Sequence, residues 1–297
     1  MVSFGKHSNF PIWISGAALL LLLLISAGMF WLLLSKGLAA SWAQELWREI
    51  GSAAFGTVAI VVVMTVFAAP LGILVAIYLH EYATDGFFVR GVRIALNNLA
   101  GIPAIVGGLF GLAFFINFLG EGIDRTFFNH ELPLPTFGKG GILWASLTLA
   151  LLTLPTMVVA TENALAAVPS ASREEALALA ATKLQILWYI VRPNAIMGIC
   201  SGITLTMSRG TATVAPLIIM STIQATPVEA ASAFLHMERE FAHLGFHIFD
   251  AGVAAGVNVE VAQSVAYTAV LLLVLLTLGF HLIAIVLRNC SQHPRAI

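Results

Sequence analysis

The sequence predicts an all-α polytopic membrane protein with six transmembrane helices. Hydrophobic residues make up 59% of its 297 residues and charged residues only 10%, whereas soluble domains average about 25% charged residues. The mean hydropathy is +0.95. Six segments also carry the run of about 20 apolar residues that a membrane-spanning helix needs. This composition excludes an ordinary cytosolic enzyme, a disordered chain and a secreted disulfide-rich domain. The net charge of -1 argues against a surface that binds polyanions.

The six segments form one transmembrane domain over residues 1–297, with a core at 53–288. Lys6 and His7 precede the first apolar run, as in a signal peptide. That run is longer than the roughly 7–15 residues of a signal core, so we expect a retained span. The predicted spans are residues 10–34, 53–79, 94–119, 142–160, 195–222 and 264–287.

The basic residues orient these spans. Lysine and arginine are more frequent in the loops on the side of the N-terminus than in the opposite loops. The positive-inside rule therefore places both termini in the cytoplasm, for a multi-pass protein of the cytoplasmic (inner) membrane. The longest extracytoplasmic loop is then 223–263, and residues 161–194 form the main cytoplasmic segment.

This cytoplasmic segment has its own helical pattern. Ser172 can cap a helix, and the negative charges of Glu174 and Glu175 suit its first turn. Leucines and alanines then follow at helical spacing up to Pro193, which we expect to separate this helix from the next span. The pattern predicts an amphipathic helix over 170–192. It is either a helix lying in the lipid interface or a docking helix for a cytoplasmic partner.

Arg209 is the ionisable side chain that the sequence places deepest in a span. It lies about 24 Å along a helix counted from Pro193, near the bilayer midplane. A charge at that depth is costly and usually functional. A guanidinium suits a tetrahedral oxyanion, although a structural pair across the bundle is the other interpretation. Nearby Thr211, Thr213 and Pro216 suggest a polar pore lining, or a close-packed interface of small residues.

The cytoplasmic pattern EEALALAATKLQ…VRP resembles the EAA loop of binding-protein-dependent ABC importer permeases. Glu174, Ala176 and Pro193 match that motif, whereas Ala180 stands at its glycine and Arg192 at its leucine. The resemblance implies a coupling helix that sits in a cleft of an ATPase subunit and transmits its closure. We expect Ala180 to make that helix stiffer. The coupling residues so implied are Glu174, Glu175, Ala176, Ala180, Thr182 and Pro193.

Three further strings resemble the PstA-type permeases of phosphate importers, over about residues 52 to 290. Arg209, Ala215 and Pro216 match Arg-x-x-Gly-Glu-Thr-Ala-Pro, and the segments 77–83 and 98–111 match two other strings of that subfamily. Asn97, Ala104 and Thr213 replace Glu, Ser and Glu, so Arg209 has fewer acidic partners than its counterparts. The candidate substrate-pathway residues are Arg209, Thr213, Thr211, Asn98 and Asn97.

The resemblance also implies partners: a second homologous permease, two ABC ATPase subunits and an extracytoplasmic solute-binding protein. The sequence has no phosphate-binding P-loop, so we expect a non-catalytic subunit without cofactors and ATP hydrolysis in a partner. Inorganic phosphate is the expected substrate. The alternatives are another oxyanion or small solute, and a sensor or scaffold that transports nothing.

A metal-dependent membrane enzyme is a remote alternative. On a helix, four side chains of the outer loop would form one stripe of imidazoles and a carboxylate, which is typical of metal sites. The other interpretation is a surface amphipathic helix, and Gly245 weakens any helical assignment. The stripe comprises His236, Glu240, His243 and His247.

Overall fold

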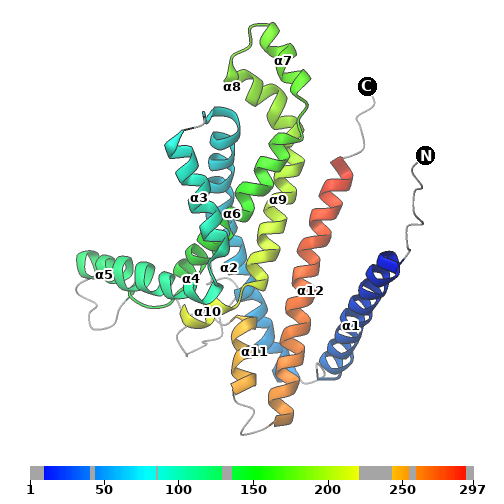
Figure 1. Ribbon diagram of the computed structural model, residues 1–297. Coiled ribbons are helices and arrows are strands. Elements are labelled where there is room, and N and C mark those ends of the chain that lie inside the picture. The colour runs from blue at the N-terminus through cyan, green and yellow to red at the C-terminus, as the bar shows by residue number, and fades with distance from the viewer. Residues whose placement is uncertain are drawn as a thin grey trace.

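The computed structural model describes residues 10–40, 44–84, 86–128, 136–220, 243–253 and 259–291, and all the regular elements within these ranges are helices. The long helices run roughly side by side, and a shorter helical arm projects from them (Figure 1). The α-helices are α1 (Phe10–Ala40), α2 (Gln44–Ile77), α3 (Phe87–Gly101), α4 (Ala104–Gly111), α5 (Glu121–Phe127), α6 (Ile142–Ala166), α7 (Ser170–Ala178), α8 (Lys183–Ile186), α9 (Arg192–Ala212), α10 (Ala215–Met220), α11 (Leu244–Val253) and α12 (Val259–Ser291). Three π-helical segments join them: η1 (Tyr78–Tyr82), η2 (Leu112–Gly120) and η3 (Leu187–Val191).

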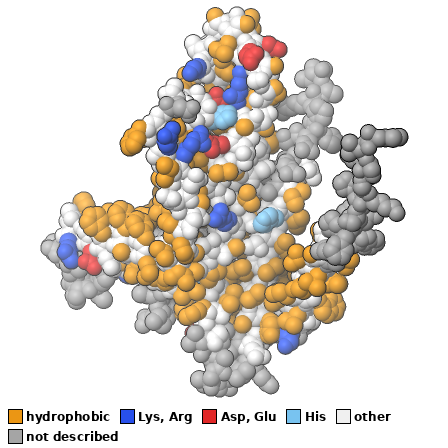
Figure 2. Space-filling model, in the orientation of Figure 1, with side chains coloured by type: hydrophobic (Ala, Val, Ile, Leu, Met, Phe, Trp, Pro, Cys, Tyr) orange, Lys and Arg blue, Asp and Glu red, His pale blue; other side chains and the backbone are white. Residues whose placement is uncertain are grey.

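The centre of the bundle consists of α2, α6 and α9. Helix α12 packs on α9, α1 packs on α12, and α3 packs on α6. In the part of the chain that the structure describes, six helical segments are long and apolar enough to cross a membrane, which agrees with the predicted number of spans. On the face shown in Figure 2, most charged side chains lie toward the end of the bundle that carries α7, and hydrophobic side chains cover much of the rest.

Close approaches of small residues hold the central helices together. A Cβ at Gly202 would lie 2.9 Å from the Ala160 Cβ, and one at Gly72 would lie 2.6 Å from Met157 Cγ. Threonine hydroxyls inside the spans donate to carbonyls one turn back, as Thr153 does to Leu149 at 2.8 Å. Their polar groups are therefore satisfied within one helix, as an apolar surrounding requires.

The third span differs from the predicted continuous helix over 94–119. Helix α3 ends at Gly101, and Ile102 and Pro103 are extended, with ψ values of 128° and 135°. A proline has no N–H to donate and disfavours helical backbone in the residue before it, so the helix breaks here. The segment α4–η2–α5 then leaves in a new direction (Figure 1), and it is Ala104–Phe127 that is apolar enough to span.

Pro193 does not separate two helices, so that prediction was wrong. The segments α8, η3 and α9 form one span from Lys183 to Ala212. The π-helical turn of η3 immediately precedes Pro193, and its wider hydrogen bonding accommodates a residue that cannot donate. The span instead ends at Ala212, and α10 begins at Ala215.

The predicted helix over 170–192 is two helices rather than one. Helix α7 ends at Ala178, and α8 begins after Thr182, whose hydroxyl accepts from the Gln185 N–H in a capping box. Between them Ala180 has φ of 57°, in the left-handed region. A residue there cannot continue a right-handed helix, which explains the break.

Candidate functional site

Arg209 lines a cavity of about 350 Å³ between α3, α6 and α9. Most of the wall is apolar or small. Asn97 of α3 and Thr156 and Asn163 of α6 supply the other polar side chains. The cavity thus presents one cation, two amides and one hydroxyl, a set of donors suited to a small oxyanion.

The guanidinium of Arg209 is held by a hydroxyl and not by an acid. Its Nη1 donates to Thr156 Oγ1 at 2.5 Å, and Thr213 Oγ1 donates to the Arg209 carbonyl at 2.7 Å. Among the described residues, none of the three ion pairs involves Arg209. Its side chain is also exposed in the single chain. The positive charge is therefore available to a ligand or a partner subunit.

Arg209 and its neighbour Ser208 lie within the span Lys183–Ala212. The Ser208 hydroxyl lies 2.8 Å from Nδ1 of His281 on α12, which lies within the span Gln263–Ile283. A cation inside a span needs a polar or aqueous surrounding.

The structure brings together some of the predicted pathway residues and not others. Asn97 lines the cavity with Arg209, while Asn98 is exposed on α3 and is not part of the wall. Thr211 is buried, and its hydroxyl donates to the Met207 carbonyl. Thr213 bonds the backbone of Arg209, as described above.

Two polar residues of the cavity, Thr156 and Asn163, were not predicted. They lie seven residues apart on α6, so they share a face of that helix. A hydroxyl and an amide at heptad spacing in an otherwise apolar span are a signal that could have identified them.

The small residues near Arg209 serve packing as well. A Cβ at Gly210 would lie 2.5 Å from Met64 Sδ on α2, and one at Gly108 would lie 2.7 Å from Pro216 Cα. Helix α2 therefore lies directly against the turn of α9 that carries Arg209. Both interpretations of this segment, polar lining and close-packed interface, apply to different faces of it.

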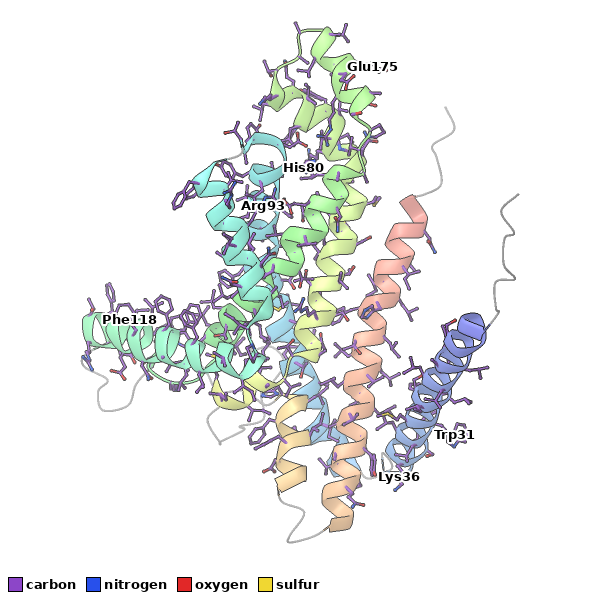
Figure 3. All side chains as sticks on the ribbon, in the orientation of Figure 1. Trp31, Lys36, His80, Arg93, Phe118 and Glu175 are labelled. Carbon is purple, nitrogen blue, oxygen red and sulfur yellow. The ribbon has the colours of Figure 1, made fainter. Side chains whose placement is uncertain are left out.

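Helices α7 and α8, at one end of the bundle, form the surface that the sequence predicts for coupling to an ATPase (Figure 1). Ala176 is buried, and Glu174 and Glu175 are exposed, with Glu175 at the tip in Figure 3. A shallow cavity of about 370 Å³ lies between the turn 179–181, α8 and η3. Large apolar side chains around it are exposed, with Leu179 at 85% and Tyr189 at 74%. Ala180 lies in the turn, so the expectation that it stiffens a helix was wrong.

Two histidines of the outer segment, His243 and His247, fall within the described residues and are buried, which contradicts a surface helix over this part. His243 and His247 are 1% and 7% exposed, and α11 packs on α2, α10 and α12. Gly245 lies within α11, where its missing side chain allows Val214 to approach. Burial, with the neighbouring His247, lowers the pKa of His243 from 6.5 to about 4.

The predicted metal stripe lies partly outside the described residues, because His236 and Glu240 fall there. Within the described ranges, no three His, Cys, Asp or Glu side chains are placed to hold a metal ion.

Comparison with solved structures defines the class of fold. A chain of the MetNI methionine ABC transporter superposes with a TM-score of 0.62 at 18% identity, covering 84% of this chain and all of that one. A chain of the bacterial alginate ABC transporter, in complex with its pentasaccharide-bound periplasmic protein, gives 0.60 at 12% identity over 96% and 99%. The chain therefore has the fold of ABC importer permeases and is a multi-pass membrane protein. The predicted fold class is confirmed.

Phosphate transport permeases are among the curated proteins that are similar to this chain in sequence. The phosphate transport system permease protein PstA of Mycobacterium leprae is 34% identical over 177 residues, which are 60% of this chain and 52% of that protein. A PstA homolog of Mycoplasma pneumoniae is 31% identical over 57% of this chain and 24% of its own length. The PstC permease of Pasteurella multocida is 30% identical over 48% and 47%.

The resemblance to PstA-type permeases is thereby confirmed. The chain spans about half the length of the first curated relatives that it matches. No family model matches it.

Proposed function

We propose that this chain is a membrane permease subunit of an ATP-driven ABC importer that moves inorganic phosphate across the cytoplasmic membrane. The observation that carries the proposal is the Arg209 cavity, where a cation inside a span lies with amides and a hydroxyl and has no acidic partner among the described residues. The similarity to PstA and PstC permeases supports phosphate as the substrate.

The cavity lowers the cost of carrying an anion through the bilayer. An anion in a medium of low dielectric constant pays a large desolvation penalty. The charge of Arg209 and the polar groups of Asn97 and Asn163 replace part of its hydration. One arginine makes a weak site, and a weak site suits passage because a tight one would retain the substrate.

Energy enters at the α7 end, which we place in the cytoplasm. The exposed apolar side chains around the cavity between the turn 179–181, α8 and η3 offer a surface to an ATPase subunit. Closure of two ATPases would displace α7 and, with it, the spans that line the pathway. A second permease subunit completes the pore, and an extracytoplasmic binding protein delivers the substrate. ATP hydrolysis belongs to the partners.

Uptake by the reconstituted complex tests this proposal. The complex, purified with its partner subunits and binding protein, is placed in proteoliposomes that contain ATP, and uptake of ³²P-phosphate is measured. We expect ATP-dependent uptake that unlabelled phosphate competes away and sulfate, molybdate and methylphosphonate do not. Competition by one of those anions instead would assign another oxyanion. ATP hydrolysis with no uptake of any anion would favour a sensor or scaffold.

A further inference from the structure

Two ion pairs lie at the α7 end of the bundle, and both join parts of the chain that are far apart in sequence. Arg173 of α7 pairs with Glu81 of η1, with Nη1 3.0 Å from Oε1 and side-chain exposures of 21% and 17%. Arg93 of α3 pairs with Glu162 of α6 at 3.2 Å, with exposures of 50% and 21%. Figure 3 shows Arg93 and His80, the neighbour of Glu81, below α7 and α8 in that view.

Arg173 also binds the end of α6. Its Nη2 donates to the Leu165 carbonyl at 2.7 Å, one of the last carbonyls of α6, which lack partners within their own helix. The same guanidinium thus holds α6 and η1 together beneath α7. On the same face of α7, Ala176 belongs to a buried apolar cluster with Leu165 and Ile186.

The pair with Glu81 is distinctive because of the helix it reaches. The chain connects α7 to α6 by a short turn and to α9 through α8 and η3, so any displacement of α7 reaches those helices directly. Helix α2 is not adjacent to α7 in the chain. Glu81 lies in η1, the π-helical continuation of α2. The Arg173–Glu81 pair is therefore a polar connection from α7 to α2.

Helix α2 in turn contacts the substrate pathway. Met64 lies against Gly210, next to Arg209, as the 2.5 Å separation of a Gly210 Cβ from Met64 Sδ shows. Met64 is fully buried in the central core. Helix α2 is therefore in direct contact with the last turn of α9.

We propose that Arg173 is a positioning residue that ties α7 to α2 through Glu81, so that displacement of α7 by the ATPases moves the part of the pathway that holds Arg209. The proposal rests on the function proposed above. Its ion pair is largely removed from water, so the loss of one partner leaves an uncompensated charge and breaks the connection. Energetic coupling of this kind requires a direct test of pairwise dependence.

A double-mutant cycle on the reconstituted complex supplies that test, with ATP hydrolysed per phosphate imported as the readout. We expect Glu81→Gln and Arg173→Gln each to raise this ratio by between about 2-fold and about 30-fold, and the double variant to be no worse than either single variant. The matched control is Arg93→Gln, which removes the neighbouring ion pair without touching α7 and leaves the ratio unchanged. Wild-type ratios in both single variants, or effects that multiply in the double variant, would overturn the proposal.

A distance measurement keeps the test independent of the substrate and of assembly defects. Spin labels at the exposed positions Ala171 of α7 and Tyr78 of η1 report their separation with and without ATP in the full complex. We expect an unchanged separation in the otherwise wild-type chain and in Arg173→Lys, and an ATP-dependent increase in Arg173→Gln. A separation that already changes with ATP when Arg173 is present contradicts the connection. Absence of phosphate uptake by the wild-type complex would refute the proposed function alone, since this distance is measured without it.

Discussion

Because the backbone of Ala180 is left-handed, we expect Ala180→Gly to stabilise the protein, whereas alanine-to-glycine substitutions within helices destabilise it. A residue with a Cβ pays about 1–2 kcal/mol in this region, whereas glycine pays almost none. Ala180→Gly removes that strain, and the greater freedom of glycine in the unfolded chain costs about 0.4–1 kcal/mol. Ala180 is exposed with φ of 57°, so no packing is lost. We expect a net stabilisation of about 0.5–1 kcal/mol.

Ala178 provides the matched control, since it is also exposed but is the last residue of α7. The same substitution there loses helix propensity and costs up to about 1 kcal/mol. The free energies of unfolding of both variants are compared with wild type by equilibrium denaturation in detergent micelles. Opposite signs are expected. If Ala180→Gly lost as much stability as Ala178→Gly, the left-handed turn at Ala180 would be refuted and a continuous helix through this position would be indicated.

Three further predictions concern the Arg209 cavity, the buried His243 and the packing of α4. Thr156→Val removes the hydroxyl that holds the Arg209 guanidinium, a hydrogen bond worth about 1.5 kcal/mol, so we expect kcat/KM for phosphate uptake to fall about tenfold. Thr156→Ser keeps the hydroxyl and is expected to keep the wild-type kcat/KM. Equal values of kcat/KM for the two variants would contradict this role of the hydroxyl. His243 has a lowered pKa of about 4 in the folded chain. Its contribution to stability is therefore present above about pH 6.5 and is lost as the pH falls toward 4, by up to about 1.4 kcal/mol per pH unit. The free energy of unfolding measured against pH is expected to show this slope, and a His243→Phe variant that keeps the slope would disprove the assignment to His243. Gly108→Ala places a Cβ 2.7 Å from the Pro216 backbone, whereas a Cβ at Gly101 would meet open space. We expect Gly108→Ala to lower the free energy of unfolding by about 1–3 kcal/mol and Gly101→Ala to leave it unchanged. Equal thermal stability of the two variants would argue against this packing.

The number of spans was predictable because hydropathy alone determines it, but the breaks within them were not. The proline at 103 breaks a helix, while Pro193 is absorbed by a π-helical turn that precedes it. The sequence does not distinguish these cases, because the outcome depends on the hydrogen bonding of neighbouring turns. The left-handed turn at Ala180 was hidden for a similar reason, since alanine is the best helix former.

The site was predictable to the extent that charge is conspicuous in an apolar span. Arg209 was identified because a cation deep in a membrane is rare. Thr156 and Asn163 were missed because hydroxyls and amides are common in spans, and only the packing of α6 on α3 and α9 shows which of them face the cavity. The Arg173–Glu81 pair joins residues whose proximity only the tertiary fold reveals.

Phosphate uptake by an Arg209→Gln complex tests the central claim most directly. The variant keeps an N–H donor but removes the charge. The control is Arg125→Gln, which breaks an exposed pair on α5. We predict assembly of both complexes, uptake reduced at least about tenfold in Arg209→Gln, and wild-type uptake in the control, since exposed pairs contribute little. Wild-type uptake by Arg209→Gln would show that the anion passes without meeting this charge.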